Sequence, residues 1–457
     1  MYEYPKIDNV NLNKDTFVSN YIGKIELSDI FSERKNVDIR VYSQNMWIYL
    51  EYIPMIDHFI EIYRQLLSQT NFKHHRYLFY SFNITNRLTG LIGARGTGKT
   101  TLLLQFIKEK IENRDECIYL SVDNIYFSKN LLFDFVRELY EDYGVNTFFF
   151  DEIHRYGQWQ QELKNIYDSY PNIKVVFSGS STISISRGSF DLSRRGVIYQ
   201  LAGMSFREHL FFNEMANIKP LSLKKILKQR VEIEGYLSQI KRVKGHFKEY
   251  IGRGYYPFYL EDKESYYQKI LRMIDKTIYE DIPAHFNLKT KNLSKIRQIL
   301  LFLATIPPGD LSINNLSKNI GLDNKTVATF VEILEQIGLV ESVCRKATGS
   351  AIFHSKKKLF LQNPDIYMAM AQQLGNKNEI GTIREIFFIR MLKNACYPIF
   401  KSQIADFEVN ENIFEIGGRN KKLKQIRKSL QNSFLVKDNI LFGNKYEIPL
   451  YLFGFLY

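Results

Sequence analysis

Glycine, lysine and threonine are spaced between residues 93 and 100 as G-x-x-x-x-G-K-T, an arrangement that suits the phosphates of a nucleotide. The glycines let the backbone turn tightly, so that its N–H groups can face phosphate oxygens. Lys99 can reach the β- and γ-phosphates, and the Thr100 hydroxyl can ligate Mg²⁺. The sequence therefore predicts a P-loop that binds ATP and Mg²⁺. The residues predicted to contact the nucleotide are Gly93, Ala94, Arg95, Gly96, Thr97, Gly98, Lys99, Thr100 and Thr101.

The elements that must hold this loop are predicted from its flanks. An apolar run from Leu88 to Ile92 predicts a buried strand, and the run from Leu102 predicts a helix whose N-terminus favours a phosphate. Strands and helices then alternate to residue 201, with strands expected at 116–122, 145–152 and 173–181 and helices at 131–140 and 158–167. This alternation predicts an α/β fold, a parallel sheet with helices on both faces, in which ligands bind at the carboxyl ends of the strands.

Two carboxylates, Asp151 and Glu152, end one of these apolar runs. We predict that Asp151 and Thr100 hold Mg²⁺, directly or through water, and that Glu152 polarises the attacking water as general base. Ser178 ends the next strand and is predicted to sense the γ-phosphate or hold the water, with Ser180 as the alternative. Because the carboxyl ends of parallel strands meet at one edge of a sheet, these groups are expected beside the loop. The sequence thus predicts an ATPase in which Lys99, Glu152 and Ser178 are catalytic.

Three arginines follow, Arg187, Arg194 and Arg195. An arginine can stabilise the charge that develops on the transferred phosphoryl group, from its own chain or from a neighbouring one. One of the three is therefore expected to act as a finger or sensor, and a solvated basic turn is the alternative for each.

Three segments carry a resemblance to a known family. They read D-E-I-H-R-Y-G-Q-W at 151–159, V-V-F-S-G-S-S at 175–181 and R-G-V-I-Y-Q-L-A-G-M-S-F-R-E-H-L at 195–210. In this order they resemble the prokaryotic predicted AAA-superfamily ATPases that carry an uncharacterised C-terminal domain. The resemblance runs from about Leu91 to the C-terminus and implies an ATPase. It favours Arg195 as the catalytic arginine, because the family's arginine precedes an L-x-x-x-S-F segment.

The middle of the chain is predicted to be helical. Residues 204–292 resemble the lid that follows an AAA core, and such lids close on the nucleotide. Helices expected at 293–303, 312–320 and 324–337, with a hairpin at 340–344 and 351–359, predict a winged helix-turn-helix. It would contact DNA or, alternatively, only protein. The residues expected at the DNA are Asn324, Lys325, Thr326 and Thr329 on the third helix and Arg345, Lys346, Lys356, Lys357 and Lys358 at the wing.

A last α/β unit resembles a PD-(D/E)xK nuclease core. Glu385 lies on a predicted helix, and Asp406 and Glu415 lie on the two strands of a predicted hairpin. In such cores two carboxylates bind Mg²⁺, and a lysine two positions further on activates water. That position is Gly417 here, so we predict a degenerate nuclease site. The apolar stretch 448–457 is expected to close the unit as a buried strand. The bases that stand nearby as substitutes are Arg419, Lys421 and Lys422.

Composition limits the class of protein. The 457 residues carry a net charge of +13 and give a pI near 9.2, which favours DNA or another polyanion as partner, although a lysine-rich proteome would give the same balance. Three distant cysteines show no metal-ligand spacing. No apolar run approaches the ~20 residues of a transmembrane helix, and the N-terminus lacks the layout of a signal peptide. We therefore expect a cytoplasmic protein without membrane contact.

These predictions combine into one hypothesis. ATP hydrolysis would switch the contact of the C-terminal domains with DNA or a protein partner, with the oligomeric state left open. The alternatives are a nucleotide-gated interaction or signalling module with little turnover and no DNA binding, and an ATP-dependent nuclease. The predicted domains are an N-terminal extension at 1–86, a P-loop ATPase core at 87–203, a helical lid at 204–292, a winged helix at 293–361 and a nuclease-like α/β domain at 362–457.

Overall fold

The P-loop strand lies inside a five-stranded parallel sheet, with strands in the order β4-β5-β6-β3-β7. The strands are β3 (Leu88–Ile92), β4 (Cys117–Ser121), β5 (Thr147–Asp151), β6 (Lys174–Gly179) and β7 (Gly196–Gln200). The computed structural model describes residues 37–44, 47–70, 73–179, 194–286, 288–306, 313–348, 357–376, 379–422 and 432–457. The predicted α/β class with a parallel sheet is confirmed.

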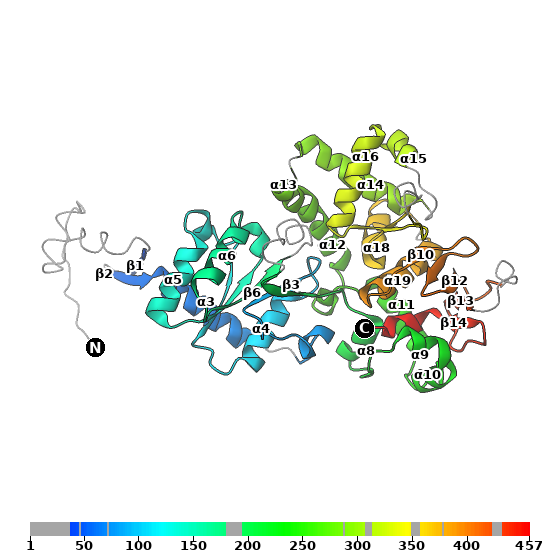
Figure 1. The fold of residues 1–457 in the computed structure, drawn as a ribbon, viewed down its shortest axis with the longest axis horizontal. Coiled ribbons are helices and arrows are strands. Elements are labelled where there is room, and N and C mark those ends of the chain that lie inside the picture. Colours follow the sequence, from blue (N-terminus) through cyan, green and yellow to red (C-terminus); the bar gives the residue numbers. More distant parts are fainter. Residues whose placement is uncertain are drawn as a thin grey trace, which may run out of the picture.

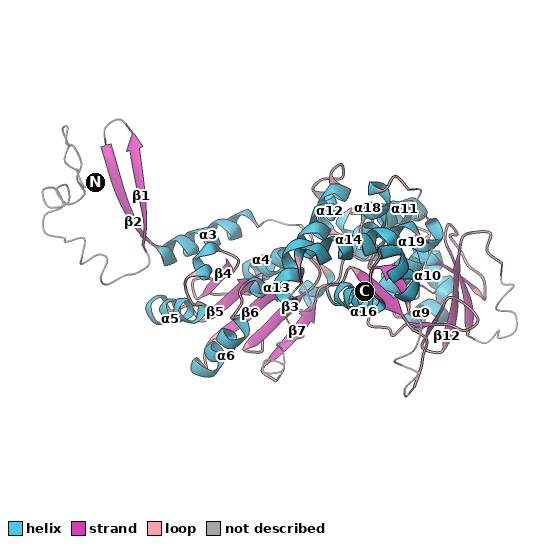
Figure 2. Cartoon of the chain, turned by 90° about the horizontal axis from the view of Figure 1, so that it is seen from above, coloured by secondary structure: helices cyan, strands magenta, loops and turns pink. Residues whose placement is uncertain are grey.

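Helices cover both faces of this sheet, as Figure 2 shows from above. The helix α4 (Lys99–Lys110) lies on one face together with α3 (Met55–Gln69), while α5 (Leu132–Tyr143) and α6 (Trp159–Ser169) lie on the other. Their apolar stripes and the buried strands form one core. Before α3, the antiparallel strands β1 (Val37–Gln44) and β2 (Trp47–Pro54) form a hairpin.

A second lobe lies beside the sheet and is mostly helical (Figure 1). Its helices are α8 (Phe206–Phe212), α9 (Leu223–Lys228), α10 (Arg230–Leu237), α11 (Val243–Arg253), α12 (Tyr266–Lys276), a π-helical turn (Thr277–Asp281), α13 (Ile282–His285), α14 (Thr290–Thr305), α15 (Ile313–Ile320), α16 (Asn324–Gln336), α18 (Pro364–Gln373) and α19 (Ile380–Asn394). Its strands are β8 (Val340–Val343), β9 (Lys358–Leu361), β10 (Phe400–Lys401), β11 (Phe407–Val409), β12 (Asn412–Gly417), β13 (Ser433–Lys437) and β14 (Glu447–Pro449).

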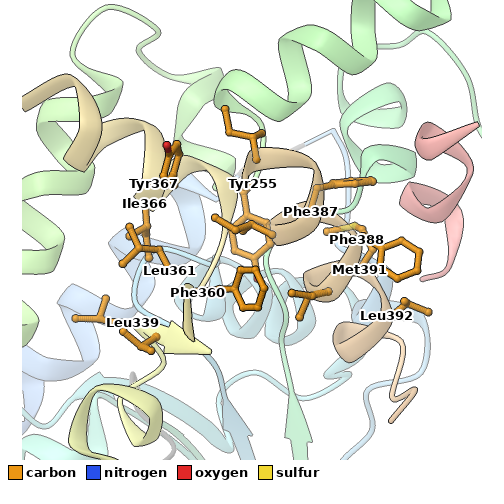
Figure 3. Close-up of a cluster of buried hydrophobic side chains, with 14 of the residues drawn as sticks. Tyr255, Leu339, Phe360, Leu361, Ile366, Tyr367, Phe387, Phe388, Met391 and Leu392 are labelled. Atoms are coloured by element: carbon orange, nitrogen blue, oxygen red, sulfur yellow. The ribbon is translucent and has the colours of Figure 1, made fainter. Parts of the chain in front are cut away.

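The second lobe is built around one continuous core. Figure 3 shows Tyr255, Phe360 and Phe387 in the same buried cluster, although the predicted domains assign them to the lid, the winged helix and the nuclease-like unit. The predicted boundaries at 292/293 and 361/362 therefore do not separate independent hydrophobic cores. Motion between these three units would have to break contacts within a packed interior.

The three helices and the antiparallel β8–β9 pair occur where the winged helix was predicted. Asp323 caps α16 by accepting the Thr326 backbone N–H at 2.9 Å, and Asn324, Lys325 and Thr329 are exposed. The prediction that Lys358 is a wing cation at the DNA is wrong, because its side chain is buried and pairs with Glu385 at 2.5 Å. Lys356 lies outside the described residues. The winged-helix assignment and its contact with DNA stay predictions.

The C-terminal sheet has the order β10-β11-β12-β13-β14, and the predicted β11–β12 hairpin is confirmed as an antiparallel pair. The predicted strand at 448–457 is wrong. The parallel pairing of β14 with β13 ends at Pro449, which has no N–H to continue the ladder, and Leu450–Phe455 form a 3₁₀ helix instead. This last segment is buried, as its composition predicted, and packs against α8.

Candidate nucleotide-binding site

The P-loop connects the end of β3 to the first residue of α4, so that Lys99 opens the helix. Gly98 has a φ of 91° and Gly96 a φ of 80°, conformations that strain any residue with a Cβ. Gly93 is required by space, because a Cβ there would lie 2.4 Å from the carbonyl oxygen of Leu201. The predicted spacing of glycines thus has a separate physical reason at each of the three positions.

The Lys99 side chain is buried and bends over its own loop. Its Nζ lies 3.1 Å from the carbonyl oxygens of both Gly93 and Ala94. Burial lowers the pKa of Lys99, whereas the carboxylates of Glu152 and Asp151 raise it. The ammonium is therefore held by two carbonyl oxygens of the loop, and the two nearby carboxylates favour its charged form.

Asp151 lies at the centre of a network of hydrogen bonds at the end of β5. Its Oδ2 accepts from the Thr100 hydroxyl and, at 2.7 Å, from the Tyr119 hydroxyl. Its Oδ1 accepts from the Ser178 hydroxyl and, at 3.0 Å, from the backbone N–H of Glu152. The fold thus brings residues of four predicted segments into direct contact.

The donor set at this point fits a magnesium ion. A carboxylate of Asp151 beside a hydroxyl of Thr100 offers hard oxygen ligands, which Mg²⁺ prefers. Within the described residues, no group of three or more His, Cys, Asp or Glu side chains could hold a metal by itself. A magnesium ion here would accordingly need phosphate oxygens and water as further ligands, which is the usual way proteins bind Mg²⁺ with a nucleotide.

Glu152 directly follows β5 in the left-handed conformation, with a φ of 54°. This conformation is uncommon outside glycine and concentrates at functional sites. Its Oε2 is buried, accepts no hydrogen bond within the described part of the chain, and lies 3.5 Å from Nε2 of His154. Burial raises the pKa of Glu152, and the Lys99 ammonium lowers it. The strained turn therefore holds a carboxylate oxygen that no described residue uses as a hydrogen-bond acceptor.

Ser178 is fully buried, and its Oγ contacts Asp151 and, at 3.3 Å, the backbone N–H of Glu152. It thus orients both carboxylate residues, whereas its predicted contact with the γ-phosphate stays a prediction. Ser180 and Arg187 lie outside the described residues.

Arg195 lies at the other edge of the sheet. It immediately precedes β7, which runs parallel to β3 with Gly196 opposite Leu88 and Gln200 opposite Ile92. The length of a five-residue strand, about 16 Å, therefore separates Arg195 from the P-loop edge. There it pairs with Asp168 at 3.3 Å. Arg195 therefore does not reach the nucleotide edge of the sheet within its own chain, and a catalytic Arg195 would have to act on a neighbouring chain.

Another arginine, which no sequence pattern predicted, lies at the back of the loop. Arg76 is buried, and its guanidinium donates to the carbonyl oxygens of Thr97 in the loop and, at 2.7 Å, of Ala202. It also pairs with the buried Glu208 at 2.9 Å. Glu208 had a local signal, since it completes a capping box with Ser205 at the start of α8. Arg76 and Glu208 therefore tie the P-loop to the first helix of the second lobe.

The second lobe also covers the open side of the loop. A Cβ on Gly96 would lie 3.0 Å from the ring of Phe258 and 3.4 Å from the sulfur of Met273. Arg95, in the loop, pairs with Asp281 at the end of the π-helical turn, with 2.9 Å between Nη2 and Oδ1. The part of the chain predicted to be a lid thus contacts the loop directly.

The carboxylates of the predicted nuclease-like site also gather in one place. Burial raises the pKa of Glu385 to about 7, Lys358 opposes this shift, and Asp406 and Glu415 add to it. Each glutamate has a lysine partner, Lys358 on Glu385 at 2.5 Å and Lys421 on Glu415 at 2.6 Å. The two glutamates are therefore neutralised by the protein's own cations, whereas Asp406 accepts the backbone N–H of Ile416 at 2.8 Å.

Lys421 fills the space beside Gly417, the position where a nuclease-like core would carry its lysine. A Cβ on Gly417 would lie 2.6 Å from Cβ and from Cγ of Lys421, so the two side chains would compete for one space. Of the three predicted substitutes, Lys421 is the base that pairs with Glu415.

The parallel sheet, the P-loop and the carboxylates at its edge are those of a P-loop ATPase domain of the AAA type. Residues 85–210 match the family model described as "AAA domain", and residues 244–379 match "Domain of unknown function (DUF8612)". Each match covers less than half of the chain. Within the described residues, no helix combines the length and the apolar composition needed to cross a bilayer.

Two curated relatives come from Methanocaldococcus jannaschii. Uncharacterized protein MJ1637 is 28% identical over 401 residues, which cover 81% of this chain and 83% of that protein. Uncharacterized protein MJ1544 is 25% identical over 266 residues, 56% of each chain. Among solved structures, the Walker-type ATPase PABY2304 of Pyrococcus abyssi is 13% identical, with a TM-score of 0.37 over 63% of this chain and 91% of that one. A likeness of that level carries no functional argument.

Proposed function

We propose that the protein hydrolyses ATP with Mg²⁺ and uses hydrolysis to switch how its second lobe contacts DNA or a protein partner. The observation that carries the enzymatic part is the network around Asp151, which joins Thr100, Ser178 and Glu152 at one edge of the sheet. A chance P-loop motif would not have its threonine bonded to a carboxylate at the end of another strand of the same sheet.

The roles follow from where the groups lie. Lys99 and the backbone N–H groups of the loop bind the phosphates, because a buried ammonium and a helix N-terminus both favour anions. Thr100 and Asp151 hold Mg²⁺, which neutralises the charge that develops on the phosphate oxygens when it is bound. Glu152 accepts the proton of the attacking water through Oε2, which accepts no hydrogen bond from the described residues. A general base must be ionised, and the Lys99 ammonium favours that form by opposing the effect of burial on the pKa of Glu152.

Contacts behind the loop support transmission of the nucleotide state to the second lobe. Arg76 links the carbonyl of Thr97 to Glu208 on α8. The C-terminal residue, Tyr457, donates from its hydroxyl to the carbonyl of Gly203 at 2.9 Å, and its ring lies 5.2 Å from that of Tyr77. The end of the chain therefore touches the connection between the two lobes, next to α8 (Figure 1).

Phosphate release by the full chain with ATP and Mg²⁺ tests the enzymatic part. Lys99→Ala is expected to abolish nucleotide binding or turnover, because the loop loses its only lysine. Turnover that persists in Lys99→Ala at the wild-type rate would refute the assignment of this site.

Binding of duplex DNA at several salt concentrations, with ATP and with ADP, tests the proposed switch. A protein that contacts phosphates loses affinity steeply between ~50 and ~200 mM salt. Lys325→Ala, on the exposed face of α16, should weaken binding, whereas Lys224→Ala on α9 is the matched control. Equal affinity with ATP and ADP would refute the switch for DNA, and no duplex binding at low salt would favour a module that contacts only protein.

A second candidate activity, ATP-dependent nuclease, is favoured by one observation: the Lys421 side chain fills the space beside Gly417, and its ammonium pairs with Glu415 at 2.6 Å. Incubation with plasmid, Mg²⁺ or Mn²⁺, and ATP tests it. Cleavage that disappears in both Asp406→Ala and Lys421→Ala would establish the activity, and intact plasmid would leave the site as a degenerate, purely structural cluster.

A further inference from the structure

Asp281 places a buried carboxylate between two arginines of the nucleotide site. Arg95 comes from the P-loop, and its Nη2 lies 2.9 Å from Oδ1 and 3.2 Å from Oδ2 of Asp281. Arg155 comes from the turn that follows Glu152, and its Nη2 lies 3.2 Å from the same Oδ1 and 2.8 Å from Oε2 of the more exposed Glu280. The Asp281 side chain is only 2% exposed. One carboxylate thus bridges the two segments that surround the predicted site of the γ-phosphate.

The two arginines have the chemistry of phosphate ligands. A guanidinium binds phosphate and carboxylate in the same bidentate way, so one anion can replace the other. Nε of Arg95 is buried and has no hydrogen-bond partner among the described residues, which leaves a donor to spare. Asp281 and Arg95 also act on the catalytic groups themselves. After the larger effects of burial and the other charges, Arg95 lowers and Asp281 raises the pKa of both Lys99 and Glu152.

Asp281 lies on the element that covers the loop. It ends the π-helical turn Thr277–Asp281 between α12 and α13, and α12 carries Met273, which lies over Gly96. π-Helical turns are rare in proteins, and those that occur are often found at functional sites. A displacement of the Asp281 carboxylate would therefore also displace α12 and α13, the helices that the turn connects.

We propose that Asp281 is an internal anion that competes with the γ-phosphate of the nucleotide for Arg95 and Arg155. The proposal rests on the proposed function as an ATP-binding site. When the γ-phosphate takes the arginines, its charge repels Asp281, and the turn at 277–281 moves off the loop. ADP lacks this phosphate and leaves the carboxylate in place. Arg95 and Arg155 then contribute to distinguishing ATP from ADP, a role that Arg195 cannot perform within its own chain from the far edge of the sheet.

A purely structural role makes the opposite prediction. If Asp281 only held the two arginines in the orientation that binds phosphate, its removal would weaken ATP binding. The sign of the change in affinity therefore separates competition from positioning.

Isothermal titration calorimetry of the full chain with ATP, ADP and tripolyphosphate tests the proposal. Asp281→Asn keeps the size of the side chain and removes its charge. It should bind ATP roughly tenfold more tightly, and ADP with little change, because one charge-assisted competitor is lost. Asp275→Asn is the matched control, since Asp275 lies on α12 and pairs with Arg297 at 2.7 Å, away from the loop. Unchanged or weaker ATP binding by Asp281→Asn would overturn the proposal.

Two further measurements keep the outcomes distinct. Hydrogen exchange of the segment around residues 277–281 should be faster in Asp281→Asn without nucleotide and in the wild type with ATP, but not with ADP. If Asp281→Asn does not fold, Arg155→Ala replaces it and should lower the affinity for ATP more than that for ADP; an unchanged ratio would refute the role of Arg155. If the wild type binds neither ATP nor tripolyphosphate, the proposed function fails together with this inference.

Discussion

Removal of the buried arginine behind the P-loop should be one of the most destabilising single changes in the first lobe. Arg76 and Glu208 have side chains that are 5% and 2% exposed, and their charged groups lie 2.9 Å apart. In Arg76→Met the apolar stem is kept, but the Glu208 carboxylate stays buried and loses its cation. It keeps only uncharged donors within the described chain, the backbone N–H groups of Tyr77 and Ser205 at 2.8 and 3.1 Å and the Ser205 hydroxyl at 3.4 Å. Breaking a buried pair on one side costs about 3–5 kcal/mol.

The cost comes from the charge that remains, so a second substitution should recover part of it. In Arg76→Met combined with Glu208→Gln no charge is left unpaired. The free energy of unfolding of the double variant should therefore lie above the value expected if the two single losses added, by about 2 kcal/mol or more. The Thr97 carbonyl loses a donor in both variants, and we expect the affinity for ATP to fall in both.

Urea denaturation followed by fluorescence measures this cycle. Trp159 is buried on α6 in the first lobe, and a Trp47→Phe background leaves it as the sole tryptophan of the chain. The signal then reports unfolding of the lobe that contains the P-loop. A loss below about 1 kcal/mol in Arg76→Met, or two single losses that simply add, would refute the argument that this pair is a coupled buried contact.

Two further predictions concern backbone conformation and pH. Gly98→Ala forces a Cβ onto a residue with a φ of 91° and should weaken ATP binding at least tenfold in calorimetry, whereas Gly157→Ala, with no atom within 4 Å of the added Cβ, should bind as the wild type does. Burial raises the pKa of Asp365 from its ordinary 3.8 to about 7, even though the N–H groups of Gly254 and Tyr255 donate to it. The folded state therefore favours the protonated carboxyl. The stability that this carboxyl contributes to the fold is fully present below pH 3.8 and is lost as the pH rises through 7. Asp365→Asn should therefore melt at a higher temperature than the wild type at pH 8 and show no such gain at pH 4; an equal difference at both pH values would contradict this.

The sequence predicted the parts of the site that depend on local pattern. The spacing of Gly93, Lys99 and Thr100 defines the loop by itself. The apolar runs that end at Asp151 and Ser178 fix the strand ends, because ends of parallel strands share one edge. These residues meet in the structure as a network of hydrogen bonds.

The remainder depends on contacts between distant segments. Asp281 is 186 residues away from Arg95 in the chain, and Arg76 is 132 residues away from Glu208, so no local spacing relates them. Buried arginines are also uncommon, which makes their location hard to predict from residue type. Arg195 could have been located better, because a residue that precedes a parallel strand lies at the edge opposite to the P-loop.

The central claim is that the P-loop, Asp151 and Glu152 form a site that hydrolyses ATP. Single-turnover hydrolysis by Glu152→Gln, together with its dissociation constant for ATP and Mg²⁺, tests this claim most directly. The amide keeps the size of the side chain and cannot accept the proton, so we expect wild-type affinity and a rate lowered ~10²- to 10⁴-fold. Wild-type turnover by Glu152→Gln would contradict the account.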